Sequence, residues 1–190
     1  MSSTNLRVHI YGHESAFLEQ VAAEFRGEIA QEPQSESDLA IFAINPNTGI
    51  SPESIAIWAS LDDYLVPRLI VVTGLTGNDG DFDDAVMLAN RVFEQCVTPY
   101  LVLHDEDGSP CALISLSDLQ IINYQTSATE ILESADEHKT LVSEFRDEYL
   151  IAIDQMGPHA FAAGLLFPAI PVDFNSGLGV NEVKQYLDQL

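Results

Sequence analysis

Residues 38–50 read Asp38-Leu-Ala-Ile-Phe-Ala-Ile-Asn-Pro-Asn-Thr-Gly-Ile50, an almost continuous apolar run that ends in a turn. Runs of this kind, without polar alternation, are typical of parallel strands that are buried on both faces. Residues 69–72 form a second such run, and residues 7–11 alternate, with Val8 and Ile10 on one face. We therefore expect three neighbouring parallel strands.

Helical periodicity separates these strands. Residues 14–25 carry apolar side chains at helical spacing, and Ser51 followed by Pro52 has the chemistry of an N-cap and first helical turn. Asp81 is the expected N-cap of a third helix. Because strands and helices alternate, we predict an open, mainly parallel α/β sheet with helices on both faces, a three-layer α/β/α fold.

The pattern changes near residue 97. Residues 100–103 and 111–116 flank a turn-rich segment, which predicts an antiparallel hairpin. Residues 97–165 are therefore interpreted as a small α+β insertion in a single domain of residues 1–190. After the insertion, residues 169–174 are expected to return as a strand, with a final helix after them.

One long amphipathic helix is predicted for residues 130–156, where Ser127 and Glu130 have the spacing of a capping box. Its inward face is expected to carry Ile131, Ala135, Val142, Phe145, Tyr149 and Ile153. The opposite face is mostly acidic, which indicates either a solvated surface or a site for a basic partner.

Composition limits the function classes. Thirty acidic against seven basic residues give a formal charge of -23, which disfavours direct binding of nucleic acid or anionic membrane. The acidity fits a salty cytoplasm or a basic partner, and plain solubility explains it at least as well as either. With no apolar leader, no bilayer-spanning run and only Cys96 and Cys111, we expect a cytoplasmic protein without a disulfide framework.

Several motifs together resemble a known family. The quoted stretch is followed at matching spacing by Trp58, Tyr64-Leu-Val-Pro-Arg68 and Asp81-Phe82, an order similar to that of the guanine-nucleotide (G) domain of elongation factor G and its relatives. Residues 106–116 resemble that family's inserted subdomain, and residues 171–180 resemble its P-V-x-x-G-S-A region. The resemblance covers nearly the whole chain and implies a P-loop NTPase fold.

The phosphate-binding motif departs from this resemblance. A phosphate loop needs G-x-x-x-x-G-K-[ST], whose amides cradle the phosphates and whose lysine neutralises them. Here Gly12 and His13 match the family, but the second glycine and the lysine are missing and Glu14 adds negative charge. The segment that holds the family's switch regions and magnesium groups is also absent, so we expect no bound cofactor.

The base-binding motifs are changed as well. Where the family has N-K-x-D, this chain has Thr73-Gly74-Leu-Thr76, and threonine cannot make the paired contact to guanine. The G-S-A match falls either on Ser176 and its neighbours or on residues 172–174. Both alternatives stay open from the sequence.

These losses predict a catalytically inactive, pseudo-GTPase domain that acts as a protein-binding or regulatory module near the translation apparatus. By the resemblance, its inserted subdomain could contact a ribosomal stalk protein. The alternatives are a nucleotide-binding protein with a remodelled pocket or very weak GTPase activity, and a relic domain whose partner carries the activity.

The sequence suggests three further sites. The missing family strands should leave residues 7–11 as a sheet edge, with Val8 and Ile10 at an interface for self-association, unless Arg7, His9 and a covering loop shield it. The glycine-rich residues 73–80, which include Asp79, suggest a ligand loop or a flexible turn. Residues 104–107 suggest a cation site or a solvated hairpin tip.

Overall fold

The computed structural model of the chain describes residues 5–77, 80–125, 130–133, 139–140 and 142–190. Its centre is a five-stranded parallel sheet with the order β2-β1-β3-β4-β9. The strands are β1 (Val8–Gly12), β2 (Glu28–Ile29), β3 (Leu39–Ile44), β4 (Arg68–Val72) and β9 (Ala169–Pro171). The expected parallel α/β sheet is confirmed.

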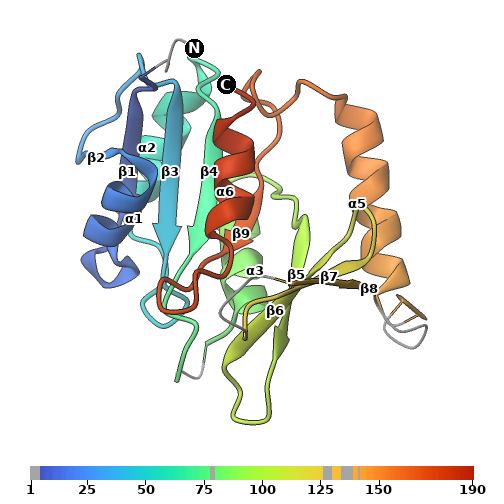
Figure 1. The fold of residues 1–190 in the computed structure, drawn as a ribbon. Coiled ribbons are helices and arrows are strands. Elements are labelled where there is room, and N and C mark those ends of the chain that lie inside the picture. The colour runs from blue at the N-terminus through green and yellow to red at the C-terminus, as the bar shows by residue number, and fades with distance from the viewer. Residues whose placement is uncertain (1–4, 78–79, 126–129, 134–138, 141) are drawn as a thin grey trace.

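Helices cover both faces of this sheet (Figure 1). One face is covered by α1 (Leu18–Phe25) and α6 (Val180–Leu187), the other by α2 (Pro52–Asp62) and α3 (Phe82–Val92). Along β3, alternate side chains enter the two cores: Ile41 packs with α1 and α6, and Phe42 packs with α2 and α3. The uninterrupted apolar run of β3 therefore follows from burial on both sides.

A second sheet is antiparallel and has the order β5-β6-β7-β8. Its strands are β5 (Tyr100–His104), β6 (Pro110–Ser115), β7 (Gln120–Asn123) and β8 (Glu130–Glu133). The predicted hairpin is confirmed as the β5–β6 pair. This sheet and α5 (Ser143–Met156) lie within the segment interpreted as an insertion, beside the parallel sheet in Figure 1.

The prediction of one helix over residues 130–156 was wrong. Residues 130–133 form β8, which pairs with β7, and the helix begins only at Ser143. Ile131 and Phe145, expected to face inward, are 66% and 54% exposed. Val142 and Tyr149 do pack against the second sheet, whereas Ser127 and Ala135 lie outside the described residues.

The N-cap residues predicted the starts of α2 and α3 correctly. Ser51 accepts a hydrogen bond from the Ser54 amide at the start of α2, and Asp81 and Asp84 form a capping box at the start of α3. The first predicted helix is instead split at Phe17 into a short 3₁₀ turn, η1 (Glu14–Ala16), and α1. Within the described part of the chain, no helix has the length and apolar character needed to cross a bilayer.

The expected open edge at β1 was also wrong. β2 pairs with β1 in parallel, and the amide of Ala30 donates to the carbonyl oxygen of Ile10. Val8 and Ile10 are 4% and 0% exposed because their side chains enter the core between the sheet and α1. These two residues are therefore part of the core and not an interface.

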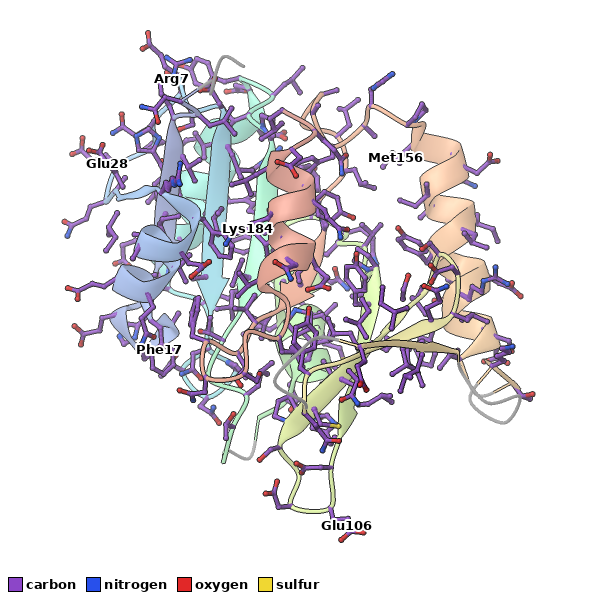
Figure 2. All side chains as sticks on the ribbon, viewed as in Figure 1. Arg7, Phe17, Glu28, Glu106, Met156 and Lys184 are labelled. Atoms are coloured by element: carbon purple, nitrogen blue, oxygen red, sulfur yellow. The ribbon has the colours of Figure 1, made fainter. Side chains whose placement is uncertain are left out.

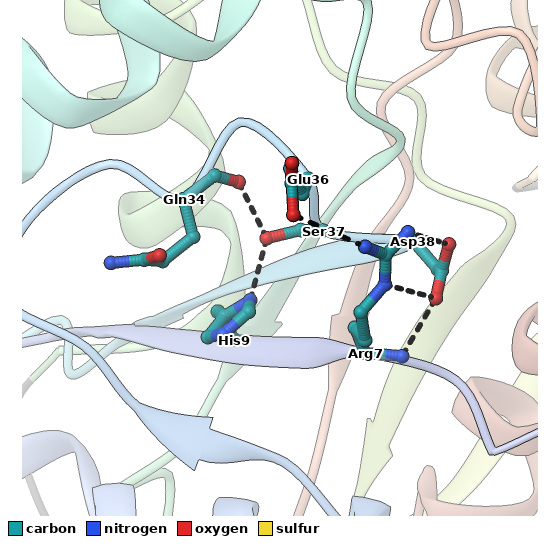
Figure 3. Close-up of polar contacts among 6 residues, drawn as sticks. All are labelled: Arg7, His9, Gln34, Glu36, Ser37 and Asp38. Carbon is teal, nitrogen blue, oxygen red and sulfur yellow. Dashed lines mark hydrogen bonds and ion pairs between the residues drawn. The ribbon is translucent and has the colours of Figure 1, made fainter.

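Polar contacts fasten the covering segment to β1 (Figure 3). The Arg7 guanidinium donates to both carboxylate oxygens of Asp38, and the Arg7 amide donates to the same group. The ring of His9 donates to the Ser37 hydroxyl, which in turn donates to the carbonyl oxygen of Gln34. The alternative in which Arg7, His9 and a loop shield the strand matches this arrangement.

Candidate functional site

The turn after β1 is closed by its own hydrogen bonds. The Ser15 amide donates to Nδ1 of His13 at 3.2 Å, the Ala16 amide to the His13 carbonyl at 2.9 Å, and the Phe17 amide to the Glu14 carbonyl at 3.2 Å. A phosphate loop needs such amides directed at the ligand. In this turn, three successive amides are instead satisfied within the protein.

Phe17 occupies the position five residues after Gly12, where the motif requires its second glycine. Its φ is 59°, a left-handed conformation that glycine adopts without strain, so the turn keeps its shape with a different side chain. Leu18 and Glu19 follow, where the motif has lysine and a hydroxyl residue. Leu18 packs against the core, so this position supplies apolar contact and no charge.

A cavity of about 320 Å³ opens next to this turn, at the carboxyl ends of β3, β4 and β9. Ligands of open parallel sheets commonly bind at this edge. Its lining residues are Phe17, Gln20, Asn45, Thr73, Gly74, Leu75, Thr76, Val172, Asp173, Phe174 and Asn175. The structure thus brings together Thr73, Gly74 and Thr76, three of the positions selected from the sequence.

Asn45 and Thr73 tie the cavity wall together. The Asn45 side chain donates to the Ser15 carbonyl at 2.9 Å and accepts from the Asn47 amide at 3.0 Å. The buried Thr73 hydroxyl donates to the Ala16 carbonyl at 2.9 Å. Gly74 has a φ of 67° and lies against Asn45, where a Cβ would come within 2.6 Å of the amide nitrogen. The loop at the position of the family's base-binding motif is therefore anchored to the turn after β1.

The loop between β9 and α6 forms the opposite wall. Asp173 accepts hydrogen bonds from the Ser176 amide at 3.1 Å and the Ser176 hydroxyl at 2.7 Å. Residues 172–175 line the cavity and Ser176 does not, although the sequence selected Ser176. The ungapped alternative, residues 172–174, lies fully in the wall. Gly12 and His13 belong to the adjoining turn and are not lining residues either.

Comparisons with known proteins show similarity in sequence and in fold. No protein-family model matches the chain. It is 27% identical, over an alignment of 187 residues, to an elongation factor G-like protein of Mycobacterium tuberculosis in strains CDC 1551 / Oshkosh and H37Rv. This chain resembles one part of that protein. The alignment covers 86% of this chain but only 25% of each relative, so the chain spans about a quarter of their length.

A solved crystal structure of a Thermus thermophilus protein has a similar fold, with a TM-score of 0.70. It is 20% identical and covers 82% of this chain and 26% of that one. At this identity the likeness supports the fold alone. The chain is therefore similar in sequence to part of an elongation factor G-like protein and similar in fold to part of this solved structure.

The acidic hairpin between β5 and β6 is organised by internal hydrogen bonds. The Asp105 carboxylate accepts from the amides of Asp107 and Ser109, and Asp107 also accepts from the Ser109 amide. Hydrogen bonds from the Ser109 hydroxyl and amide lower the pKa of Asp107 to about 2. Among the described residues, no group of three or more His, Cys, Asp or Glu side chains is arranged to hold a metal ion.

Arg68 has a structural role that the sequence did not reveal. It is 0% exposed and lies between the rings of Trp58 and Phe167, with its guanidinium carbon 4.7 and 4.5 Å from their centroids. It donates to the Asp62 carboxylate at 2.8 Å and approaches Glu94 at 3.5 Å. The motif that resembles Y-x-V-P-R in the family therefore stabilises the core under α2.

A buried acidic contact was also not foreseen from the sequence. The Tyr124 hydroxyl lies 2.8 and 2.6 Å from the two carboxylate oxygens of Glu182, which is 2% exposed. Burial and the neighbouring Glu182 raise the pKa of Tyr124, so its hydroxyl stays protonated and donates. Tyr124 follows β7 and Glu182 lies in the first turn of α6. This contact joins the second sheet to the parallel-sheet body.

Proposed function

We propose that this chain is a G-domain-like module that has lost GTP hydrolysis and acts by binding a protein partner in the translation apparatus. The observation that carries the first part is the turn after β1. Its amides donate to protein groups, and Leu18 and Glu19 stand where phosphate and magnesium need lysine and a hydroxyl. Phosphoryl transfer depends on these groups for charge stabilisation.

Nucleotide titration and single-turnover hydrolysis test this part. We expect no GTP turnover above buffer and no calorimetric binding of GTP, GDP or ATP tighter than about 100 μM, with or without magnesium. A variant with Phe17→Gly, Leu18→Lys and Glu19→Thr restores the motif and serves as the matched comparison. Binding by that variant alone would attribute the loss to these three side chains.

A groove supports the second part of the proposal. It has a volume of about 520 Å³ and lies between α3 and α5, with Met87 and Phe145 each 54% exposed in its lining. Exposed apolar side chains gathered in one groove mark interaction sites. Asp83 and Glu148 add negative charge to the lining, which suits a partner with basic residues around an apolar anchor.

The ribosomal stalk protein is the partner suggested by the family resemblance. Purified stalk protein, measured by biolayer interferometry, should bind this chain and bind the Phe145→Ser variant at least about tenfold more weakly. Leu165→Ser is the matched control, because Leu165 is 49% exposed outside the groove lining. Equal losses in both variants would contradict the groove as the docking surface.

The cavity at the strand ends favours one other candidate function, a nucleotide-binding protein with a remodelled pocket. Its volume of about 320 Å³ is within the range of small-ligand sites. Tight binding of any of the three nucleotides in the titration above would favour this second candidate over the first.

A further inference from the structure

A second cavity of about 290 Å³ adjoins the strand-end cavity, because Thr76, Asp173 and Asn175 line both. The second cavity lies between the β9–α6 loop and the second sheet, because Asp105 and Tyr124 also line it. We call the joined space the intersheet cleft, defined by the residues that line the two cavities. One end of the cleft therefore lies at the parallel sheet, and the other end lies against the second sheet.

One end of the cleft is acidic. Asp105 and Asp173 line it, and among the described lining residues of both cavities there is no lysine, arginine or histidine. Turn groups hold both carboxylates in place. Asp105 accepts from the amides of Asp107 and Ser109, and Asp173 accepts from the amides of Asn175 and Ser176 and from the Ser176 hydroxyl. A carboxylate has about four acceptor positions. Both therefore keep acceptor capacity for a cation.

The other end of the cleft is aromatic. Phe17, 45% exposed, and Phe174 line the strand-end cavity together with the apolar side chains of Leu75 and Val172. Figure 2 shows Phe17 at the lower end of the body and Glu106 at the tip of the β5–β6 hairpin. Amide and hydroxyl groups of Asn45, Thr73 and Thr76 lie in the same lining and can orient a ligand.

We propose that the intersheet cleft binds a small aromatic amine that is protonated at neutral pH. The ring packs beside Phe17 and Phe174, and the ammonium group donates to Asp105 and Asp173. Charge-assisted hydrogen bonds of this kind are stronger than neutral ones. An anion is disfavoured both by these carboxylates and by the formal charge of -23.

This inference does not depend on the proposed function, because it concerns a ligand without phosphate. Nucleotide binding would refute the loss of the phosphate site, and competition between the nucleotide and tryptamine would then show whether both occupy the strand-end cavity. Failure of the amine to bind would leave the protein-binding proposal unchanged. The two sets of titrations therefore separate the two proposals.

A series of three indoles tests the charge requirement. Tryptamine carries an ammonium group, tryptophol carries a neutral hydroxyl, and indole-3-acetate carries a carboxylate on a similar frame. At low ionic strength, titration followed by NMR should give tryptamine a Kd at least about tenfold lower than that of tryptophol. Indole-3-acetate should not bind measurably, and added salt should reduce the advantage of tryptamine.

Variants test the location. Asp105→Asn and Asp173→Asn keep an oxygen acceptor for the turn amides, and each should weaken tryptamine severalfold while leaving tryptophol unchanged. Phe17→Gly should weaken both ligands by the same factor. Because Phe17 has a φ of 59°, glycine suits its backbone, and thermal unfolding should show a fold at least as stable.

Asp154→Asn is the matched control, since it removes one carboxylate from the exposed surface of α5 outside the cleft. It should leave tryptamine binding unchanged. An equal loss in this control would show that tryptamine responds only to the general negative field, and the proposal would fail. Equal affinity for indole-3-acetate, or no effect of the three cleft variants, would overturn it as well.

Discussion

Replacing Arg68 separates packing from ion pairing in the core under α2. The side chain is fully buried between two aromatic rings, while its partners Asp62 and Glu94 are 54% and 45% exposed. If Arg68 is removed, these carboxylates can be hydrated, so little energy is lost from them. The loss in unfolding free energy then comes mainly from the lost packing and from the lost hydrogen bond to the Trp58 carbonyl, which accepts from Arg68 at 3.2 Å.

The expected magnitudes follow from this division. Arg68→Ala leaves a cavity between the rings and should cost about 3–5 kcal/mol of unfolding free energy. Arg68→Met keeps a long side chain against the rings and should cost less than about 1.5 kcal/mol. The Nε of Arg68, which has no hydrogen-bond partner among the described residues, is removed in both variants.

Urea unfolding followed by fluorescence is the direct assay, because Trp58 is the single tryptophan and lies beside Arg68. The midpoint should fall strongly for Arg68→Ala and slightly for Arg68→Met, with an unchanged m-value. For a chain of this size, the alanine variant should lose about 10 °C in Tm. If methionine proved as damaging as alanine, ion pairing would dominate and the packing argument would be refuted.

Three other predictions concern backbone, buried polar and surface contacts. Gly179→Ala places a Cβ 1.8 Å from a main-chain oxygen of β9 and should lower the free energy of unfolding by more than about 3 kcal/mol. Gly177→Ala is the control, because it has a similar φ and no described atom within 4 Å of the added Cβ. It should cost about 1–2 kcal/mol in the same urea assay. Tyr124→Phe leaves the buried Glu182 without its donor and should cost about 1–3 kcal/mol by thermal unfolding. Hydrogen bonds from the Arg7 guanidinium lower the pKa of Asp38 below its ordinary value of 3.8. The contribution of Asp38 to the free energy of unfolding is therefore fully present above pH 3.8 and is lost as the pH falls through the pKa that Asp38 has in the folded protein. Acid titration of stability should accordingly be shallower below pH 3.8 in Asp38→Asn.

The parallel sheet was predictable because its strands carry local signals. The β3 run is apolar at every position, and Ser51 and Asp81 mark helix starts through their own side chains. These features need no knowledge of distant contacts. Their positions in the structure lie close to the predicted ones.

The errors arose where the sequence pattern fits more than one structure. Ile131 and Leu132 on β8 are adjacent apolar residues, which suit a short strand as well as one turn of a helix. β2 has only two residues, too few for any period, and its role depends on pairing with β1. Local patterning cannot distinguish these cases.

The strand-end cavity was partly predictable, since Thr73, Gly74 and Thr76 were chosen from their place after a strand. Residues 104–107 were predicted as a possible cation site, but the position of Asp105 in the second cavity was not predicted, because it depends on where the hairpin of the second sheet lies. The Tyr124–Glu182 contact joins residues 58 positions apart. The only sign of this contact in the sequence is Glu182, an acidic residue among the apolar residues of the last helix.

The Tyr124–Glu182 contact has a mechanical consequence. Glu182 lies in the first turn of the helix that follows the Asp173 loop, so the second sheet is fastened to the segment that walls the cleft. A partner that tilts the second sheet would pull on this wall through the tyrosine. By thermodynamic linkage, a ligand in the cleft would then change the partner's affinity for the protein, and the partner would change the ligand's affinity by the same factor.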